Sequence, residues 1–214
     1  PLLNQSLESA QKKVEAYYFD TRKQLFEYDQ ALTLQRNGIY TERKIILFRS
    51  NVRDWVIEYA EKSLYDLLLY AQQSTKIKKN LGIDIVSLKV QELLGIPFCI
   101  SRKNLEKNIG PTFYGLQQQF QISYDLKEIE LEMIQLGLMR ELERTFLLQQ
   151  IDYSWKEHLQ KISLLRDSIS WRAYGQKNPL TEYKTEAFDL FVIMLARLRH
   201  RVIYFVLSAK LILD

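Results

Sequence analysis

Cysteine is nearly absent from this sequence of 214 residues, in which Cys99 stands alone. One thiol cannot form an internal disulfide or a metal site built from several thiolates, so both kinds of cross-link are excluded within the sequence. We expect Cys99 to be a small buried side chain. At this length the chain can bury one ample hydrophobic core or two modest ones.

Glycine and proline are also scarce, with 7 and 4 residues. No proline occurs between residues 2 and 96, which favours long helices because proline interrupts helical hydrogen bonding. Four of the glycines and two of the prolines fall between residues 82 and 115. Segments such as 94–97 and 109–111 therefore predict short helices and turns in that region.

Neither basic nor acidic residues are present in large excess. The 30 basic and 26 acidic residues are interleaved and give a net charge of +4. This weak excess is compatible with an anionic membrane surface or a polyanion but requires neither. Because the basic residues are spread rather than gathered in a stripe, a nucleic-acid-binding protein is a weak alternative. The most apolar stretch, 188–213, carries several charges, so no membrane span is predicted.

The sequence has none of the motifs that we associate with catalysis. No glycine precedes a Lys-Ser or Lys-Thr pair, which excludes a phosphate-binding P-loop, and no dinucleotide-binding glycine motif follows a strand. His158 lies beside Trp155 on an apolar stripe and is interpreted as a structural histidine rather than a ligand or base. Glu128, Glu130 and Glu132 alternate around a helix as on a solvated face. We predict no catalytic residue, metal or cofactor in this chain alone.

One helix is predicted from residue 4 to about residue 50. Its apolar positions recur every 3.5 to 3.6 residues, at Val14, Tyr18, Thr21, Leu25, Tyr28, Leu32, Ile39 and Ile46. At 1.5 Å per residue it is about 70 Å long, too long for a small local core to cover, so we interpret it as a strut. Gly38 lies within it at a cost of about 1 kcal/mol relative to alanine, which makes a bend possible there.

Two further helical patterns follow. The first runs from about Asn51 to Gln73, with apolar positions at Trp55, Tyr59, Leu64 and Leu68. The second begins at about Tyr124 and is predicted to continue without interruption into the first helix of a hairpin.

The C-terminal third predicts two antiparallel helices joined by a nine-residue polar loop. Matching apolar stripes flank the loop in steps of 3 and 4. The first comprises Leu147, Ile151, Trp155, His158, Ile162, Leu165 and Ile169, and the second Tyr183, Ala187, Phe191, Met194, Leu198, Val202 and Phe205. Asn178 and Pro179 match an N-cap and a first helical position. Gly175 permits a positive φ in the loop, and Tyr174 lies near its tip.

Two long motifs in this order resemble the SecA family, the ATP-driven motor subunits of the preprotein translocase. The first resembles the start of the helical scaffold domain and reads AQKKVE at 10–15, FDTRKQL at 19–25, EYD at 27–29, QR at 35–36 and IY at 39–40. The second resembles the two-helix finger and reads WKEHL at 155–159, LR at 165–166, RAYGQKNP at 172–179 and EYK at 182–184.

The resemblance implies an all-α fold with a long scaffold helix at 1–50, a small helical wing domain inserted at 51–133 and the two-helix finger at 134–214. The chain begins at Pro1 without an initiator methionine, so we expect a piece of a longer protein. The nucleotide-binding domains, with ATP and Mg, and the preprotein crosslinking domain would belong to the remainder. Frequent Ile, Lys, Tyr and Phe suggest an AT-rich genome and favour an algal plastid over a free-living bacterium.

The resemblance also implies roles for the finger loop. Tyr174 would contact the translocating polypeptide, since its ring can lie on any extended chain while its hydroxyl tolerates water. The alternative is a tyrosine that packs back on its own hairpin. Arg172 and Lys177 would meet acidic channel loops or lipid phosphates, or serve only as solubilising loop residues.

Three other residues acquire expected roles in the same way. Arg22 and Asp29 of the long helix would face the motor as charged partners that report nucleotide state; the alternative is a solvated helix face. The family usually has two adjacent acids where this sequence has Asp29 and Gln30, so a contact needing the second carboxylate is missing. Trp155 would pack the finger on the scaffold helix.

The implied partners are a SecY-type channel, an unfolded preprotein, the nucleotide-binding domains of the parent chain and an acidic phospholipid surface, with no specific nucleic acid. The implied location is the cytoplasm or plastid stroma, at the periphery of the plasma or thylakoid membrane. The competing hypothesis is a free-standing helical scaffold or adaptor without a motor. A parent reading frame without P-loop and helicase-type motifs would favour it.

Overall fold

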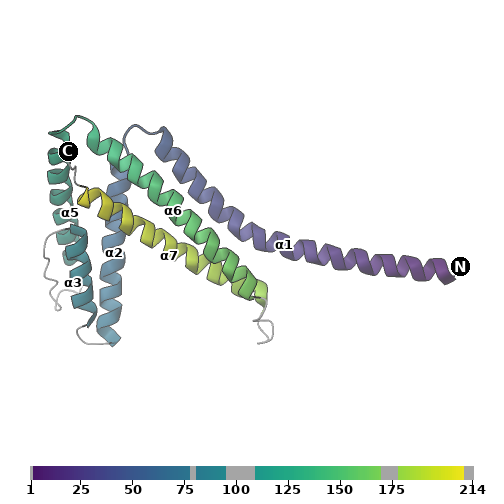
Figure 1. Cartoon of the computed structure of the whole chain (residues 1–214). Coiled ribbons are helices and arrows are strands. Elements are labelled where there is room, and N and C mark those ends of the chain that lie inside the picture. Colours follow the sequence, from purple (N-terminus) through teal and green to yellow (C-terminus); the bar gives the residue numbers. More distant parts are fainter. Residues whose placement is uncertain (1, 78–80, 95–108, 170–177, 210–214) are drawn as a thin grey trace. The chain divides into compact units, whose positions relative to one another are not determined.

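The computed structural model describes residues 2–77, 81–94, 109–169 and 178–209, and every element in these ranges is an α-helix (Figure 1). The helices are α1 (Leu2–Phe48), α2 (Arg53–Ile77), α3 (Leu81–Leu94), α5 (Ile109–Glu132), α6 (Leu138–Ile169) and α7 (Pro179–Ser208). The predicted all-α class is confirmed. Within the described ranges, no helix combines the length and the apolarity that crossing a bilayer would require.

The chain forms two compact units, and the boundaries between them fall inside helices. Unit 1 comprises residues 1–42 and 155–193, and unit 2 comprises residues 43–154 and 194–214. Unit 1 therefore contains most of α1 with the parts of α6 and α7 that adjoin the hairpin loop. The expected domains at 1–50, 51–133 and 134–214 stay a prediction.

Helix α1 has 47 residues, and most of its apolar side chains in unit 1 are exposed. Leu7, Val14, Tyr18, Leu25 and Phe26 are each more than half exposed. Ile39, by contrast, is buried in unit 1. The expectation that a local core cannot cover the whole helix is thus confirmed. Gly38 lies inside the helix, which continues to Phe48.

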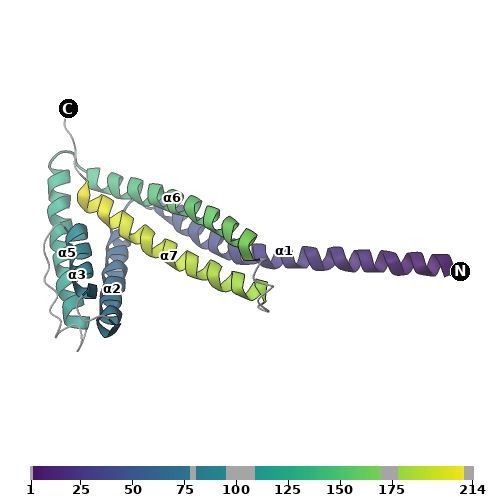
Figure 2. The ribbon, with the colours of Figure 1, turned by 60° about the horizontal axis from the view of Figure 1, so that its bottom comes forward.

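Unit 2 is built around three helices, with α2 packed against both α3 and α5 and α3 packed against α5 (Figure 2). The buried apolar side chains of these three helices include Val56, Tyr59, Ala60, Leu64, Leu68, Ala71, Val86, Val90, Leu116, Phe120, Tyr124 and Leu131. Helix α5 also carries apolar side chains on the opposite side, where Ile122, Leu126 and Ile129 are more than half exposed.

The C-terminal part of α7 in unit 2 corrects the predicted stripe at one position. Phe205 is 38% exposed, whereas Ile203 and Val206 are each only 2% exposed. The buried row runs in steps of four from Met194 through Leu198 and Val202 to Val206. Helices commonly pack along such i±4 ridges, and this row leaves Phe205 at the edge of the covered side, where its ring stacks on that of Phe146 in α6 with centroids 5.8 Å apart.

The predicted break at 109–111 is wrong. Helix α5 begins at Ile109, so Gly110, Pro111 and Gly115 all lie within it. Proline is tolerated in a first helical turn because the first four N–H groups of a helix have no acceptor within the helix. The composition of this segment therefore marks a helix start rather than an interruption.

The prediction of one continuous helix from Tyr124 into the hairpin is also wrong. Helix α5 ends at Glu132 and α6 begins at Leu138. In the turn between them Gly137 adopts a φ of 83°, which glycine tolerates best. Its N–H donates to Glu132 Oε2 at 2.7 Å, and this bond satisfies a backbone donor at the turn.

The turn between α1 and α2 is held by two side chains. Arg144 Nη2 donates to the carbonyl oxygens of Arg49 and Ser50 at 2.6 and 3.0 Å, immediately after the last residue of α1. A cation at this place satisfies orphan carbonyls and interacts favourably with the helix dipole. Asn51 Oδ1 accepts a hydrogen bond from the Arg53 N–H at 2.9 Å and so fixes the start of α2.

A polar cluster joins α5 to α6 within unit 2. Glu143 is fully buried and accepts hydrogen bonds from the Tyr124 hydroxyl and from Arg140, the latter at 2.9 Å. Burial raises the pKa of Glu143, although these hydrogen bonds oppose the shift. Arg140 also pairs with Glu128, which is half-buried. The expected solvated face is therefore wrong for Glu128 but right for Glu130, which is exposed.

We predict opposite effects of alanine at two glycines. A Cβ at Gly38 or at Gly137 would meet no atom within 4 Å, so neither substitution causes a clash. Gly38→Ala should stabilise the chain by about 1 kcal/mol because alanine loses less conformational entropy in a helix. Gly137→Ala should destabilise it by about 1 kcal/mol because an L-residue is strained at positive φ. Urea unfolding followed by circular dichroism measures both, and changes of the same sign would refute this account.

Candidate functional site at the base of the helical hairpin

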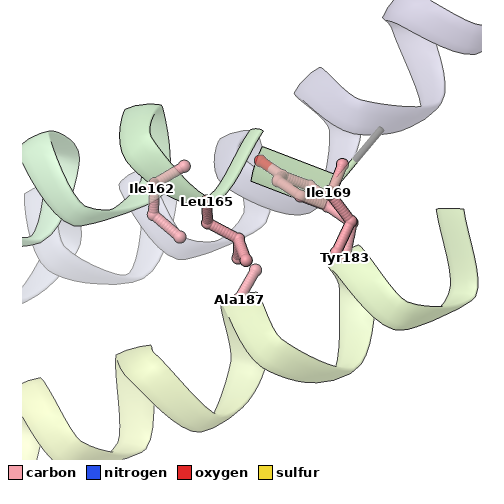
Figure 3. Close-up of a cluster of buried hydrophobic side chains, with 5 residues drawn as sticks. All are labelled: Ile162, Leu165, Ile169, Tyr183 and Ala187. Carbon is pink, nitrogen blue, oxygen red and sulfur yellow. The ribbon is translucent and has the colours of Figure 1, made fainter. Parts of the chain in front are cut away.

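The described part of the hairpin in unit 1 is closed by a hydrophobic cluster that three helices share. Ile162, Leu165 and Ile169 of α6 meet Tyr183 and Ala187 of α7 (Figure 3). Tyr28, Ala31 and Leu32 of α1 and Leu190 of α7 pack against this cluster while remaining partly exposed. Both hairpin helices thus bury their stripes against each other and against α1.

The predicted start of the second hairpin helix is confirmed. Helix α7 begins at Pro179, and Asn178 Oδ1 accepts a hydrogen bond from the Leu180 N–H at 3.0 Å. This side chain satisfies one of the N–H groups left without a helical acceptor, while proline has none to lose at that position.

An aromatic pair joins α1 to α7 next to the cluster. The rings of Tyr28 and Tyr183 meet edge to face, with centroids 4.7 Å apart, the arrangement that aromatic quadrupoles favour. Burial raises the pKa of Tyr183; the charge of Arg166 opposes this shift and the charge of Asp29 adds to it. The carboxylate of Asp29 therefore acts electrostatically on the hairpin base.

Trp155 joins α6 to α1 at the other end of unit 1. Its side chain is 8% exposed, and its ring meets Tyr40 of α1 edge-on with centroids 6.4 Å apart. The same indole lies 5.6 Å from the imidazole of His158. The structure thus places Trp155 between the hairpin and the long helix.

His158 is 1% exposed and lies between two aromatic rings, those of Trp155 and Phe191. Its Nε2 is 2.8 Å from Gln35 Oε1, whereas its Nδ1 is buried without a hydrogen-bond partner. Burial, with a smaller contribution from the charge of Lys161, lowers the pKa of His158 to about 4. The imidazole is therefore neutral at pH 7.

Gln35 has a structural position that the sequence analysis did not identify. Its Oε1 contacts His158 of α6, and its Nε2 donates to the carbonyl oxygen of Ala187 in α7 at 3.1 Å. A signal was available, because the apolar stripe of α1 passes from Leu32 to Ile39 and leaves position 35 to a polar residue on the same helix side. A polar residue within an apolar stripe indicates a specific hydrogen bond at a packed surface.

The other predicted site residues fall into two groups. Arg22 and Asp29 are exposed on α1 and, seven residues apart, share one side of the helix. Tyr174, Arg172 and Lys177 lie outside the described residues. No group of three His, Cys, Asp or Glu side chains in the described ranges is placed to hold a metal ion. The described site holds α1, α6 and α7 together through aromatic packing and through the side-chain amide of Gln35, which bonds to both α6 and α7.

Comparison with known proteins identifies the kind of chain to which this site belongs. The family described as SecA Wing and Scaffold domain matches residues 1–210. The chain is 60% identical over 215 residues to a protein translocase subunit SecA of Emiliania huxleyi, covering 100% of this chain and 24% of the relative. Its identity to the same subunit is 47% in Antithamnion sp., again covering 100% and 24% of the two chains, and 42% in Thermosynechococcus vestitus, covering 95% and 22%. The chain thus spans about a quarter of the length of these relatives.

We predict that His158 makes the stability of the chain depend on pH. The unfolded chain has an ordinary histidine pKa of about 6.5, so it binds a proton below that pH while the folded chain does not until about pH 4. The contribution of His158 is complete above pH 6.5 and is lost as the pH falls, by about 2 kcal/mol at pH 5. His158→Gln carries no titrating group and should lose correspondingly less stability between pH 7.5 and 5. Urea unfolding at both pH values measures the difference, and parallel losses in the two proteins would contradict the prediction.

Proposed function

Because this chain belongs to the SecA family, of which it contains the wing and scaffold region, we propose that it is the force-transmitting helical part of a preprotein translocase motor. The observation that carries the proposal is that two parts of α1 differ in how they are covered. Near its C-terminal end in unit 1 this helix packs on both hairpin helices, whereas earlier along its length apolar side chains are exposed. One continuous helix thus has a surface that holds the hairpin and a surface that fits another partner.

In this proposal the exposed surface of α1 lies against the nucleotide-binding domains of the parent polypeptide, which hold ATP and Mg. Exposed apolar patches on helices mark interaction sites more often than chance, and the aliphatic and aromatic side chains from Leu7 to Phe26 form such a surface. Arg22 and Asp29 then face the motor as charged contacts. Because backbone hydrogen bonds stiffen a helix along its axis, a displacement at this surface reaches the hairpin base.

In this proposal the hairpin carries the displacement of α1 on to the preprotein. Its loop joins the end of α6 at Ile169 to the start of α7 at Pro179. We assign the loop residue Tyr174 to contact with the unfolded preprotein inside a SecY-type channel, with Arg172 and Lys177 near acidic channel loops or lipid phosphates. The parent protein would work at the periphery of a membrane, in an algal plastid or a bacterium.

We predict that Trp155→Ala raises the basal ATPase activity of the parent protein. The substitution removes the contact between Trp155 and Tyr40, so the hairpin no longer restrains the motor when no preprotein is bound. ATP turnover without channel or preprotein measures this, and the expected increase is severalfold. Trp155→Phe keeps an aromatic ring against Tyr40 and should raise turnover less. Unchanged turnover of a folded Trp155→Ala protein would refute the restraint.

The substrate contact is tested by photocrosslinking. A photoreactive amino acid at position 174 of the parent protein, stalled on a channel with a labelled preprotein, should crosslink to the preprotein in a nucleotide-dependent way. The same probe at Lys12, which is exposed on α1, should not. Crosslinks confined to the parent chain itself would make Tyr174 a packing residue and would favour a scaffold or adaptor function.

A further inference from the structure

The side chain of Gln35 in α1 bonds to both hairpin helices. An amide carries an acceptor oxygen at one end and donor hydrogens at the other, held in one plane. In Gln35 the oxygen lies 2.8 Å from His158 Nε2 of α6, and the nitrogen donates at 3.1 Å to the Ala187 carbonyl of α7. A single side chain of α1 is therefore hydrogen-bonded to α6 and to α7 at the same time.

The chemistry of the two partners fixes the orientation of this amide. A backbone carbonyl only accepts hydrogen bonds, so the Gln35 nitrogen must face Ala187 and the Gln35 oxygen must face His158. The imidazole must then carry its proton on Nε2. This assignment leaves Nδ1 as a bare acceptor, which agrees with its buried position without a donor partner.

The bridge with His158 forms at one axial position of α6, and a one-turn shift brings either Ile162 or Ser154 to Gln35 in its place. A shift of α6 by one turn, about 5.4 Å, replaces the residue facing Gln35 by one four positions away. Toward the loop that residue is Ile162, whose side chain can neither donate nor accept a hydrogen bond. In that case the half-buried amide oxygen would lose its partner, and the loss of a hydrogen bond at a packed surface is costly. The carbonyls of α7 recur at every residue, so His158 is the partner that selects the position.

We propose that the hydrogen bond between Gln35 and His158 is a register lock that holds the hairpin at one position along α1, and that Gln35 is therefore a positioning residue for preprotein movement. The proposal rests on the function proposed above. While the lock is closed, a displacement of α1 carries the hairpin with it. Without the lock, the hydrophobic cluster still holds the helices together, but apolar surfaces tolerate sliding since their attraction is not directional. ATP hydrolysis then continues with less transport for each ATP consumed.

The test measures the length of preprotein transported per ATP hydrolysed, in the intact parent protein with channel-containing vesicles. Gln35→Leu keeps the size of the side chain and removes both hydrogen bonds. We expect transport per ATP to fall by about fivefold, the change in an equilibrium that one net hydrogen bond produces, while ATP turnover is maintained. Gln160→Leu makes the same chemical change at an exposed position of α6 and should have no effect. Equal losses in the two variants would overturn the lock.

A second pair of variants separates register from stability. Ile162→Val removes one methylene group from the cluster beside the bridge and lowers the melting temperature without touching the hydrogen bonds, so transport per ATP should be unchanged. If it falls in proportion to the melting temperature, as in Gln35→Leu, the role of Gln35 is only structural. His158→Phe fits between the two flanking rings and leaves no unpaired imidazole proton. Combined with Gln35→Leu, it should cause no further loss, whereas additive losses would show that the two side chains act independently.

Failure of the lock and failure of the proposed function have different signatures. If the probe at position 174 crosslinks to the preprotein and Gln35→Leu transports normally, the function stands and the lock is wrong. If the probe gives no crosslink to the preprotein, the assignment of the hairpin fails, and with it the premise of the lock.

Discussion

The two helices of the hairpin pack against each other along one apolar contact, and in unit 1 the third helix, α1, packs against that contact. The buried side chains of Ile162, Leu165, Ile169, Tyr183 and Ala187 pack against one another, and Tyr28, Ala31 and Leu32 of α1 pack against them. Two helices of this length gain little stability from their own backbones, since most helical stability in proteins comes from packing of an apolar face. The position of the hairpin base thus depends on how its two helices pack on α1. The aromatic and polar contacts at positions 28, 35 and 40 refine that placement.

Sequence reasoning recovered what depends on local periodicity. The first hairpin stripe, from Leu147 to Ile169, is buried at each of the seven expected positions, because steps of 3 and 4 fix which residues share a helix side. The start at Pro179 was likewise predictable from local capping chemistry. For the finger loop the resemblance, rather than periodicity, named the residues.

What the sequence did not reveal depends on partners far along the chain. Glu143 occupies the same four-residue series as Met139, Leu147 and Ile151, and its burial makes sense only with Tyr124 and Arg140 beside it. Gly38 and Gly137 are the same residue type in the sequence, yet Gly38 lies within a helix whereas Gly137 adopts a positive φ. Phe205 fits its stripe by spacing, but tertiary packing selects the i±4 row instead. Periodicity states which residues share a side; it does not state where the neighbouring helix crosses that side.

The uncovered apolar side chains of α1 bear on how a cell handles this polypeptide. Leu7, Val14, Tyr18, Leu25 and Phe26 are all more than half exposed, which is the kind of surface that quality control treats as a sign of misfolding. A copy of the chain in which this surface stays open is a substrate for chaperones and proteases, even though its own helices are correctly formed.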